Sequence, residues 1–173
     1  MMRTRKPLIV MTPKSLLRNK ASTSTLEELA SGGFQIVIDD PVVTDRTQVK
    51  RVVLCSGKVY YDLAEAQATS GQQDIAIVRI EQLYPIPHEQ LTAVLQSYPV
   101  CHEIAWCQEE PQNQGAWYQS RHNLLASMRT GQTLYYTGRP SSASPAVGYH
   151  SVHMEEQKAL VSEAISVGAG LRQ

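Results

Sequence analysis

The stretch that decides the fold is RVVLCSGKVYYDLAEAQATSGQQDIAIVRI, residues 51–80. Two short, largely apolar runs, residues 52–55 and 74–80, enclose a helical segment, residues 58–69, which Gly71 follows. Strands without polar alternation are typical of parallel sheets covered on both faces, and a helix between two such strands is their usual crossover connection. The stretch therefore predicts a strand, a helix and a second, parallel strand.

The same alternation continues towards the end of the chain. Further strands are expected at residues 103–107 and 133–137, and further helices at residues 87–97, 116–129 and 151–167. Four strands that alternate with four helices predict a doubly wound α/β domain. Right-handed crossovers bring all strand-to-helix loops of such a sheet to its carboxyl edge. Three loops are expected at that edge: residues 56–58, 108–115 and 138–150.

The first 50 residues are less regular. Six basic residues precede the first acidic residue, Glu27, and form either a solvated face or an anion-binding rim. We expect residues 1–50 to connect the chain to an upstream domain that it does not contain, and residues 51–173 to form the α/β core of one domain overall. Apolar runs predict short strands at residues 8–11 and 34–38 of the N-terminal segment. Pro13, at a position that a helix tolerates, and capping-box spacing predict a helical turn at residues 14–18 and a capped helix from Ser24.

Composition excludes several classes of function. Basic and acidic side chains balance at 16 each, so no overall field draws the protein to nucleic acid or to an anionic membrane. The sequence has no apolar run long enough to span a bilayer and no signal-peptide pattern. Its three cysteines, Cys55, Cys101 and Cys107, lie within or beside apolar runs without CxxC spacing, as buried thiols of a reducing compartment do. We expect a cytoplasmic protein.

The loop WCQEEPQNQGAW, residues 106–117, carries two adjacent carboxylates, Glu109 and Glu110. A catalytic acid/base pair needs both carboxylates on one side of a substrate, whereas adjacent residues at the end of a strand point to opposite sides. A structural edge loop is therefore favoured, in which a carboxylate accepts hydrogen bonds from loop amides or from a basic residue. Amides from Asn113 and Gln114 would satisfy backbone groups there, and Gly115 would permit close backbone approach.

Two further features concern charge. Ser56-Gly57-Lys58 joins a buried strand to a helix, where backbone amides and a lysine could bind an anion, but a simple structural turn remains open because no complete phosphate-binding motif is present. Arg79 lies within an apolar strand and needs a partner, for which the candidates are Glu81, Glu109, Glu110 or, failing these, an anionic ligand.

No metal site is expected from the histidines. His150 and His153 form an HxxH pair across a loop–helix junction, but no third ligand lies nearby in the sequence and the HExxH motif is absent. Capping or surface roles are therefore favoured for both side chains.

Several long runs, in the same order, resemble one family. They are TPKSLLR (residues 12–18), CSGKVYYDL (55–63), RIEQLYPIP (79–87), WCQEEPQNQGAW (106–117) and GRPSSASPAVG (138–148). The chain is similar, from about residue 6 to residue 167, to the C-terminal region of the thiamine diphosphate-dependent first component of the 2-oxoglutarate dehydrogenase complex. The resemblance implies a three-layer, transketolase C-terminal-like α/β fold with a mostly parallel five-stranded sheet.

The resemblance also implies an oxidoreductase of the tricarboxylic acid cycle that works as a homodimer. Members of the family use thiamine diphosphate and magnesium to decarboxylate 2-oxoglutarate, and then succinylate the lipoyl group of the dihydrolipoyl succinyltransferase component. The family's cofactor ligands and active-site histidines lie in upstream domains, so this fragment is expected to contain no catalytic and no cofactor-binding residue. Its expected role is structural, in dimerisation and regulation.

Some members of the family are regulated by acetyl-CoA or AMP. For such an anionic effector the expected binding residues are Lys14, Arg18, Ser56, Lys58 and Arg79. The expected docking loop comprises Glu109, Glu110, Asn113, Gln114 and Gly115. Two other functions stay open from the residues: a free-standing nucleotide- or CoA-binding module that uses the same edge loops, and a small doubly wound hydrolase.

Overall fold

A computed structural model describes residues 6–168 of the chain. The chain divides into two compact units, with the boundary between Gly32 and Gly33. The second unit therefore begins before residue 51, the expected start of the core, because the strand that follows Gly33 is part of the sheet.

The N-terminal unit consists of short helices with no buried side chain. These are the 3₁₀ helices η1 (Lys14–Arg18) and η2 (Lys20–Ser22) and the α-helix α1 (Leu26–Ala30). The capping box of α1 is formed by Thr25 and Glu28, one residue later than the expected start at Ser24. The expectation of a strand at residues 8–11 was wrong: the segment forms no strand, and its four apolar side chains are 65–91% exposed. An apolar run needs a partner strand to become one, and this unit offers none within its described residues.

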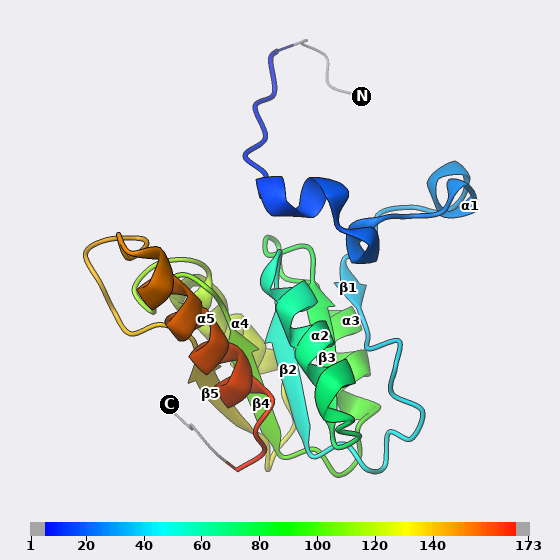
Figure 1. Ribbon diagram of the computed structural model, residues 1–173. Coiled ribbons are helices and arrows are strands. Elements are labelled where there is room, and N and C mark those ends of the chain that lie inside the picture. The colour runs from blue at the N-terminus through cyan, green and yellow to red at the C-terminus, as the bar shows by residue number, and fades with distance from the viewer. Residues whose placement is uncertain (1–5, 169–173) are drawn as a thin grey trace. The chain divides into compact units, whose positions relative to one another are not determined.

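The second unit is built on a five-stranded sheet (Figure 1). Strands β2, β3, β4 and β5 are parallel, while the two-residue strand β1 pairs antiparallel with β3 at the edge of the order β1-β3-β2-β4-β5. This confirms the mostly parallel five-stranded sheet, although β1 is shorter than the expected strand at residues 34–38. The strand bounds are β1 Val37–Ile38, β2 Arg51–Cys55, β3 Ile75–Ile80, β4 Glu103–Cys107 and β5 Thr133–Thr137.

Four helices cover the two faces of the sheet, as a three-layer fold requires. Side chains of α2 and α5 pack with one set of strand residues around Val53, whereas α3 and α4 pack with the opposite set around Leu54. Each helix lies within two or three residues of its predicted bounds at either end, which is ordinary uncertainty for helix termini. The bounds are α2 Val59–Ser70, α3 His88–Gln96, α4 Trp117–Ser127 and α5 His150–Ala164.

Two buried charges are satisfied within the second unit. Arg51 is fully buried, and it bonds the carboxylate of Glu103 and the last backbone carbonyls of α5. Asp40 follows β1 and accepts hydrogen bonds from the backbone amide of Ile77 in β3, at 2.7 Å, and from the side chain of Gln67, at 3.1 Å. Beyond the end of β1, the side chain of Asp40 therefore continues the hydrogen bonding to the edge of β3 that β1 begins.

Candidate functional site

A cavity lies at the carboxyl ends of the parallel strands. From β2 the chain moves to β3 on one side, and from β4 it moves to β5 on the other, so β2 and β4 flank the point where the strand order reverses. Ligand sites of open α/β sheets form outside this point. A pocket of about 620 Å³ occupies it, and we call it the switch-point pocket.

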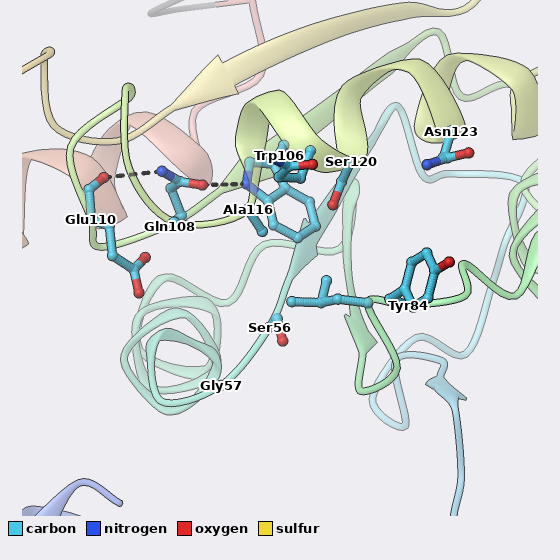
Figure 2. A pocket seen from close by; sticks show the side chains of 12 residues that line it. Ser56, Gly57, Tyr84, Trp106, Gln108, Glu110, Ala116, Ser120 and Asn123 are labelled. Carbon is cyan, nitrogen blue, oxygen red and sulfur yellow. Dashed lines mark hydrogen bonds between the residues drawn. The ribbon is translucent and has the colours of Figure 1, made fainter. Parts of the chain in front are cut away.

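Loops from three strands and the start of α4 line the switch-point pocket (Figure 2). Ser56 and Gly57 come from the loop after β2, and Tyr84 from the segment after β3. The loop after β4 contributes Gln108 and Glu110. The helix α4 adds hydroxyl and amide groups to the wall, from Gln119, Ser120 and Asn123.

Gln108 organises the loop after β4. Its Oε1 accepts hydrogen bonds from the indole of Trp106, at 2.9 Å, and from the backbone amide of Trp117, at 3.0 Å. Its Nε2 donates to the backbone oxygens of Glu110, Pro111 and Gln114, at 3.2, 3.1 and 2.8 Å. The buried side-chain amide of Gln108 thereby connects the end of β4, the following turn and the start of α4. Both its oxygen and its nitrogen are used in hydrogen bonds.

Gln108 was not predicted from the sequence, because the side-chain amides of Asn113 and Gln114 were expected to form the hydrogen bonds to the backbone groups of this loop. The available signal was position: Gln108 is the first polar residue after a buried strand, and it lies between two tryptophans. Asn113 and Gln114 do satisfy backbone groups, but those of the neighbouring loop. Both side chains donate to the backbone oxygen of Ser142, at 2.9 and 3.0 Å.

Both the backbone conformation at position 115 and the lack of room for a side chain there require glycine. Its φ is +63°, which side chains rarely adopt, and a Cβ there would lie 3.0 Å from Nε2 of Gln108 and 3.1 Å from the side chain of Glu110. The expected close approach of backbone at Gly115 is therefore observed.

Glu109 belongs to a polar network on the opposite side of the loop. Its carboxylate accepts hydrogen bonds from Lys58, at the start of α2, and from Gln157 of α5. Gln157 also donates to Asp62 of α2, at 2.7 Å. Glu109 and Glu110 thus diverge as expected, because one enters this network and the other lines the switch-point pocket.

Arg139, two residues after the end of β5, is the second organiser that sequence reasoning missed. Only 8% of the residue is exposed, and its guanidinium bonds the carboxylate of Glu156 at 2.8 Å, the side chain of Gln157 at 3.0 Å and the backbone oxygen of Glu109. A smaller pocket of about 200 Å³ lies between Arg139, Pro111 and the serines of the following loop. The three predicted edge loops therefore meet through Lys58, Glu109 and Arg139.

The residues expected to bind an effector are distributed over both units. Lys14 and Arg18 belong to η1 in the N-terminal unit, whereas the other three belong to the second unit. Ser56 lines the switch-point pocket, Lys58 holds Glu109, and Arg79 bonds Glu81 at 2.9 Å. Of the three carboxylates expected as candidate partners of Arg79, Glu81 is the one that it bonds, and the guanidinium also lies 4.5 Å from the centre of the Tyr60 ring.

The cysteines have the character of inert core thiols. Burial raises the pKa of Cys55 to about 12 and that of Cys101 to about 11, and it raises the pKa of Cys107 well above its ordinary value. Cys55 and Cys107 are register partners on β2 and β4. A thiol that stays protonated is a poor nucleophile, so no cysteine chemistry is indicated at the edge.

Two absences can be stated for the part of the chain that the structure describes. Between residues 6 and 168, no three side chains of His, Cys, Asp or Glu gather as metal ligands do. In the same residues, no helix has the length and apolarity to cross a membrane.

Comparison with known proteins decides the family. Residues 23–165 match the model of the family described as 2-oxoglutarate dehydrogenase C-terminal. The chain belongs to this family. It is 54% identical over 162 residues to the 2-oxoglutarate dehydrogenase E1 component of Cupriavidus necator and 54% identical over 162 residues to that of Haemophilus influenzae. The E1 component of Azotobacter vinelandii is 52% identical over 166 residues.

The family members are much longer than this chain. Each of these alignments covers 94% of the chain but only 17%, 17% and 18% of the respective relative. The chain therefore spans less than a fifth of the length of the curated relatives it matches. Residues 1–22 lie outside the family match, in the same N-terminal unit whose described apolar side chains are exposed.

Proposed function

We propose that this chain is the C-terminal part of a thiamine diphosphate-dependent 2-oxoglutarate dehydrogenase E1 component. The observation that carries the proposal is 54% identity, over 94% of the chain, to proteins with that name. The longer protein would act in the tricarboxylic acid cycle of the cytoplasm as a homodimer. It would decarboxylate 2-oxoglutarate and transfer the succinyl group to the lipoyl group of the dihydrolipoyl succinyltransferase component.

The cofactors of the longer protein would be thiamine diphosphate and magnesium. Magnesium is held by clustered oxygen ligands, and within residues 6–168 no three His, Cys, Asp or Glu side chains are placed to hold a metal ion. This part of the chain does not fit the cofactor pair, so we assign its ligands to polypeptide outside the chain and derive no catalytic step from these residues.

The role we assign to this chain is to complete the assembly. The N-terminal unit exposes large apolar side chains at a density that a solvated surface rarely has. Packing against the rest of the longer protein would remove them from water, and residues 8–11 would then find the partner strand that their sequence favours. The exposed residues are Leu8, Ile9, Val10, Met11, Leu17, Leu26 and Leu29.

Regulation by an anionic effector is a second proposal. Lys14 and Arg18 support it, because neither forms an ion pair within residues 6–168 and both are available to a phosphate group. Lys58 and Arg79 support it less, since each already holds a carboxylate. Calorimetric titration of the longer protein with acetyl-CoA and with AMP tests it. Absence of heat at millimolar concentrations of both compounds would remove it.

The main proposal is tested by comparing this chain with the longer protein. With thiamine diphosphate and magnesium added, the longer protein should decarboxylate 2-oxoglutarate and elute as a dimer, while residues 1–173 alone should do no chemistry. Decarboxylation by the 173-residue chain alone would overturn the assignment of the catalytic groups to other parts of the polypeptide. Saturable binding of AMP by the isolated chain, without any activity of the longer protein, would favour a free-standing nucleotide-binding module.

A further inference from the structure

Glu110 lies in the switch-point pocket with an uncompensated negative charge. Within residues 6–168 its carboxylate forms no ion pair, and the hydrogen bonds of the residue are made by its backbone oxygen, which accepts from Gln108 and Tyr136. The adjacent Glu109 accepts hydrogen bonds from Lys58 and Gln157, both at Oε1. The two carboxylates of this loop therefore differ: one is used inside the unit and the other is not.

The rest of the pocket wall is neutral. Glu110 is the one charged residue among the described groups that line it, and the other polar groups are hydroxyls and amides such as those of Ser56, Gln119 and Asn123. These groups supply oxygen acceptors around a carboxylate. A phosphate-bearing nucleotide would meet repulsion here, whereas an ammonium or guanidinium group would find both a counter-charge and hydrogen-bond acceptors.

An aromatic ring at the pocket adds a second preference for a cation. Tyr84 is 92% exposed although it is a large aromatic side chain, and Figure 2 shows it on the opposite side of the pocket from Glu110. A cation placed against a tyrosine ring is stabilised by the ring quadrupole. Tyr84 and Glu110 together offer a ring face and a counter-charge to a basic side chain that enters between them.

We propose that the switch-point pocket receives a lysine- or arginine-bearing segment of the polypeptide that lies outside this chain, with Glu110 as the ion-pair partner. The inference rests on the proposed function, under which the chain is part of a longer protein. More than four-fifths of each matched relative lies outside the aligned region. The volume of about 620 Å³ exceeds what one side chain fills, so a length of backbone enters with the basic group.

Carboxyl footprinting of the longer protein tests the occupancy of the pocket. A carbodiimide and an amine label exposed carboxylates, and mass spectrometry reads the rate at each residue. Glu110 is exposed in this chain, as is Glu65 on α2, which forms no ion pair and serves as the matched control. We expect loss of labelling at Glu110 in the longer protein, with Glu65 labelled as in the isolated chain. Equal labelling of Glu110 in both proteins overturns the inference.

Charge reversal tests the chemistry of the occupant. Glu110→Lys should lower the Tm of the longer protein, Glu65→Lys should not, and neither substitution should change the Tm of the isolated chain. A loss of Tm by Glu110→Lys in both proteins would mean that the residue acts within this unit, and no loss in either would mean that no basic group faces it. Either result overturns the inference.

Two further outcomes would also overturn the inference. Protection of Glu110 in the isolated chain that grows with protein concentration would mean that a second copy fills the pocket, and it would overturn the proposed segment. Retained 2-oxoglutarate decarboxylation by the longer protein, with Glu110 freely labelled, would overturn the inference alone and leave the proposed function standing.

Discussion

The side chain of Lys58 donates a hydrogen bond to the carboxylate of Glu109, 51 residues further along the chain. This bond connects the start of α2 with the loop after β4, and Gln157 connects the same carboxylate with α5 at 2.9 Å. The carboxylate of Glu109 thus joins α2, the loop after β4 and α5, three segments that are distant in sequence. They meet at the carboxyl edge of the sheet because the parallel strands end there. The stability of the edge should therefore depend on this residue.

Replacement of Glu109 measures that dependence. Glu109→Ala removes the closest acceptor of Lys58 and one of the two acceptors of Gln157, which keeps Asp62; both donors are less than fully solvated, so we expect a loss of about 1–3 kcal/mol in the free energy of unfolding. Urea unfolding gives the value. The control is Glu65→Ala on the exposed face of α2, which should change little. Equal midpoints for the two variants would contradict the structural role of Glu109.

Removal of the Gln108 side chain tests the organisation of the pocket wall. Gln108→Ala leaves the indole N–H of Trp106 and the amide of Trp117 without the acceptor they share, at a cost of about 1–3 kcal/mol for each buried donor that stays unsatisfied. Gln112→Ala, in the same loop, removes a side chain that forms no hydrogen bond within the described residues. A calorimetric Tm that falls equally for both variants would count against Gln108 as the organiser.

Gly115→Ala separates steric contact from backbone strain. Gly57 also has a positive φ, +76°, but a Cβ there would meet nothing within 4 Å, so Gly57→Ala introduces strain alone. That strain amounts to roughly 1–2 kcal/mol. At Gly115 the added Cβ would in addition displace Gln108 and Glu110, and we expect a clearly larger loss of stability in denaturant unfolding. A Gly115→Ala variant no less stable than Gly57→Ala would refute the close packing.

The buried thiol of Cys55 predicts a pH dependence. Its pKa is raised from 9.0 to about 12 by burial, so the folded state retains a proton that the unfolded state loses. The contribution to stability is complete below pH 9 and decreases as the pH rises from 9 towards 12. Unfolding free energies measured across this window should fall less steeply in Cys55→Ala. An unchanged slope would show that the thiol does not contribute.

The same burial predicts slow reaction with alkylating agents. Cys55, Cys101 and Cys107 are all buried, and each thiol has a raised pKa, so none presents a thiolate to a reagent in the folded protein. Iodoacetamide should modify the three residues together, at the rate of unfolding. Fast modification of any one of them in the native protein would be inconsistent with this packing.

The helices and core strands could be predicted from the sequence because their signals are local. Runs such as residues 52–55 are apolar on both faces, Gly71 caps the end of α2, and Pro99 follows shortly after α3. The run at residues 8–11 carries the same signal, yet no strand forms there, since a strand also needs a neighbour that the pattern does not contain. Strand order likewise depends on which helices cross which face, and periodicity does not record this.

The candidate site was predictable only in part. The three edge loops followed from strand direction, and the divergence of Glu109 from Glu110 followed from the alternation of side chains along a strand. Gln108 and Arg139 were missed because their importance depends on partners far along the chain. Arg139 bonds Glu109 and Gln157, residues 30 and 18 positions away, and no spacing rule connects them.

The carboxylate of Asp40 has a consequence for self-association. Open edges of sheets recruit strands from other molecules, and this is a common route to aggregation. By accepting the amide of Ile77, Asp40 removes a donor that an incoming strand would need just beyond the short β1. Loss of this one carboxylate should therefore allow molecules to associate through the β3 side of the sheet. Solutions of an Asp40→Ala variant would then become turbid before the protein had unfolded.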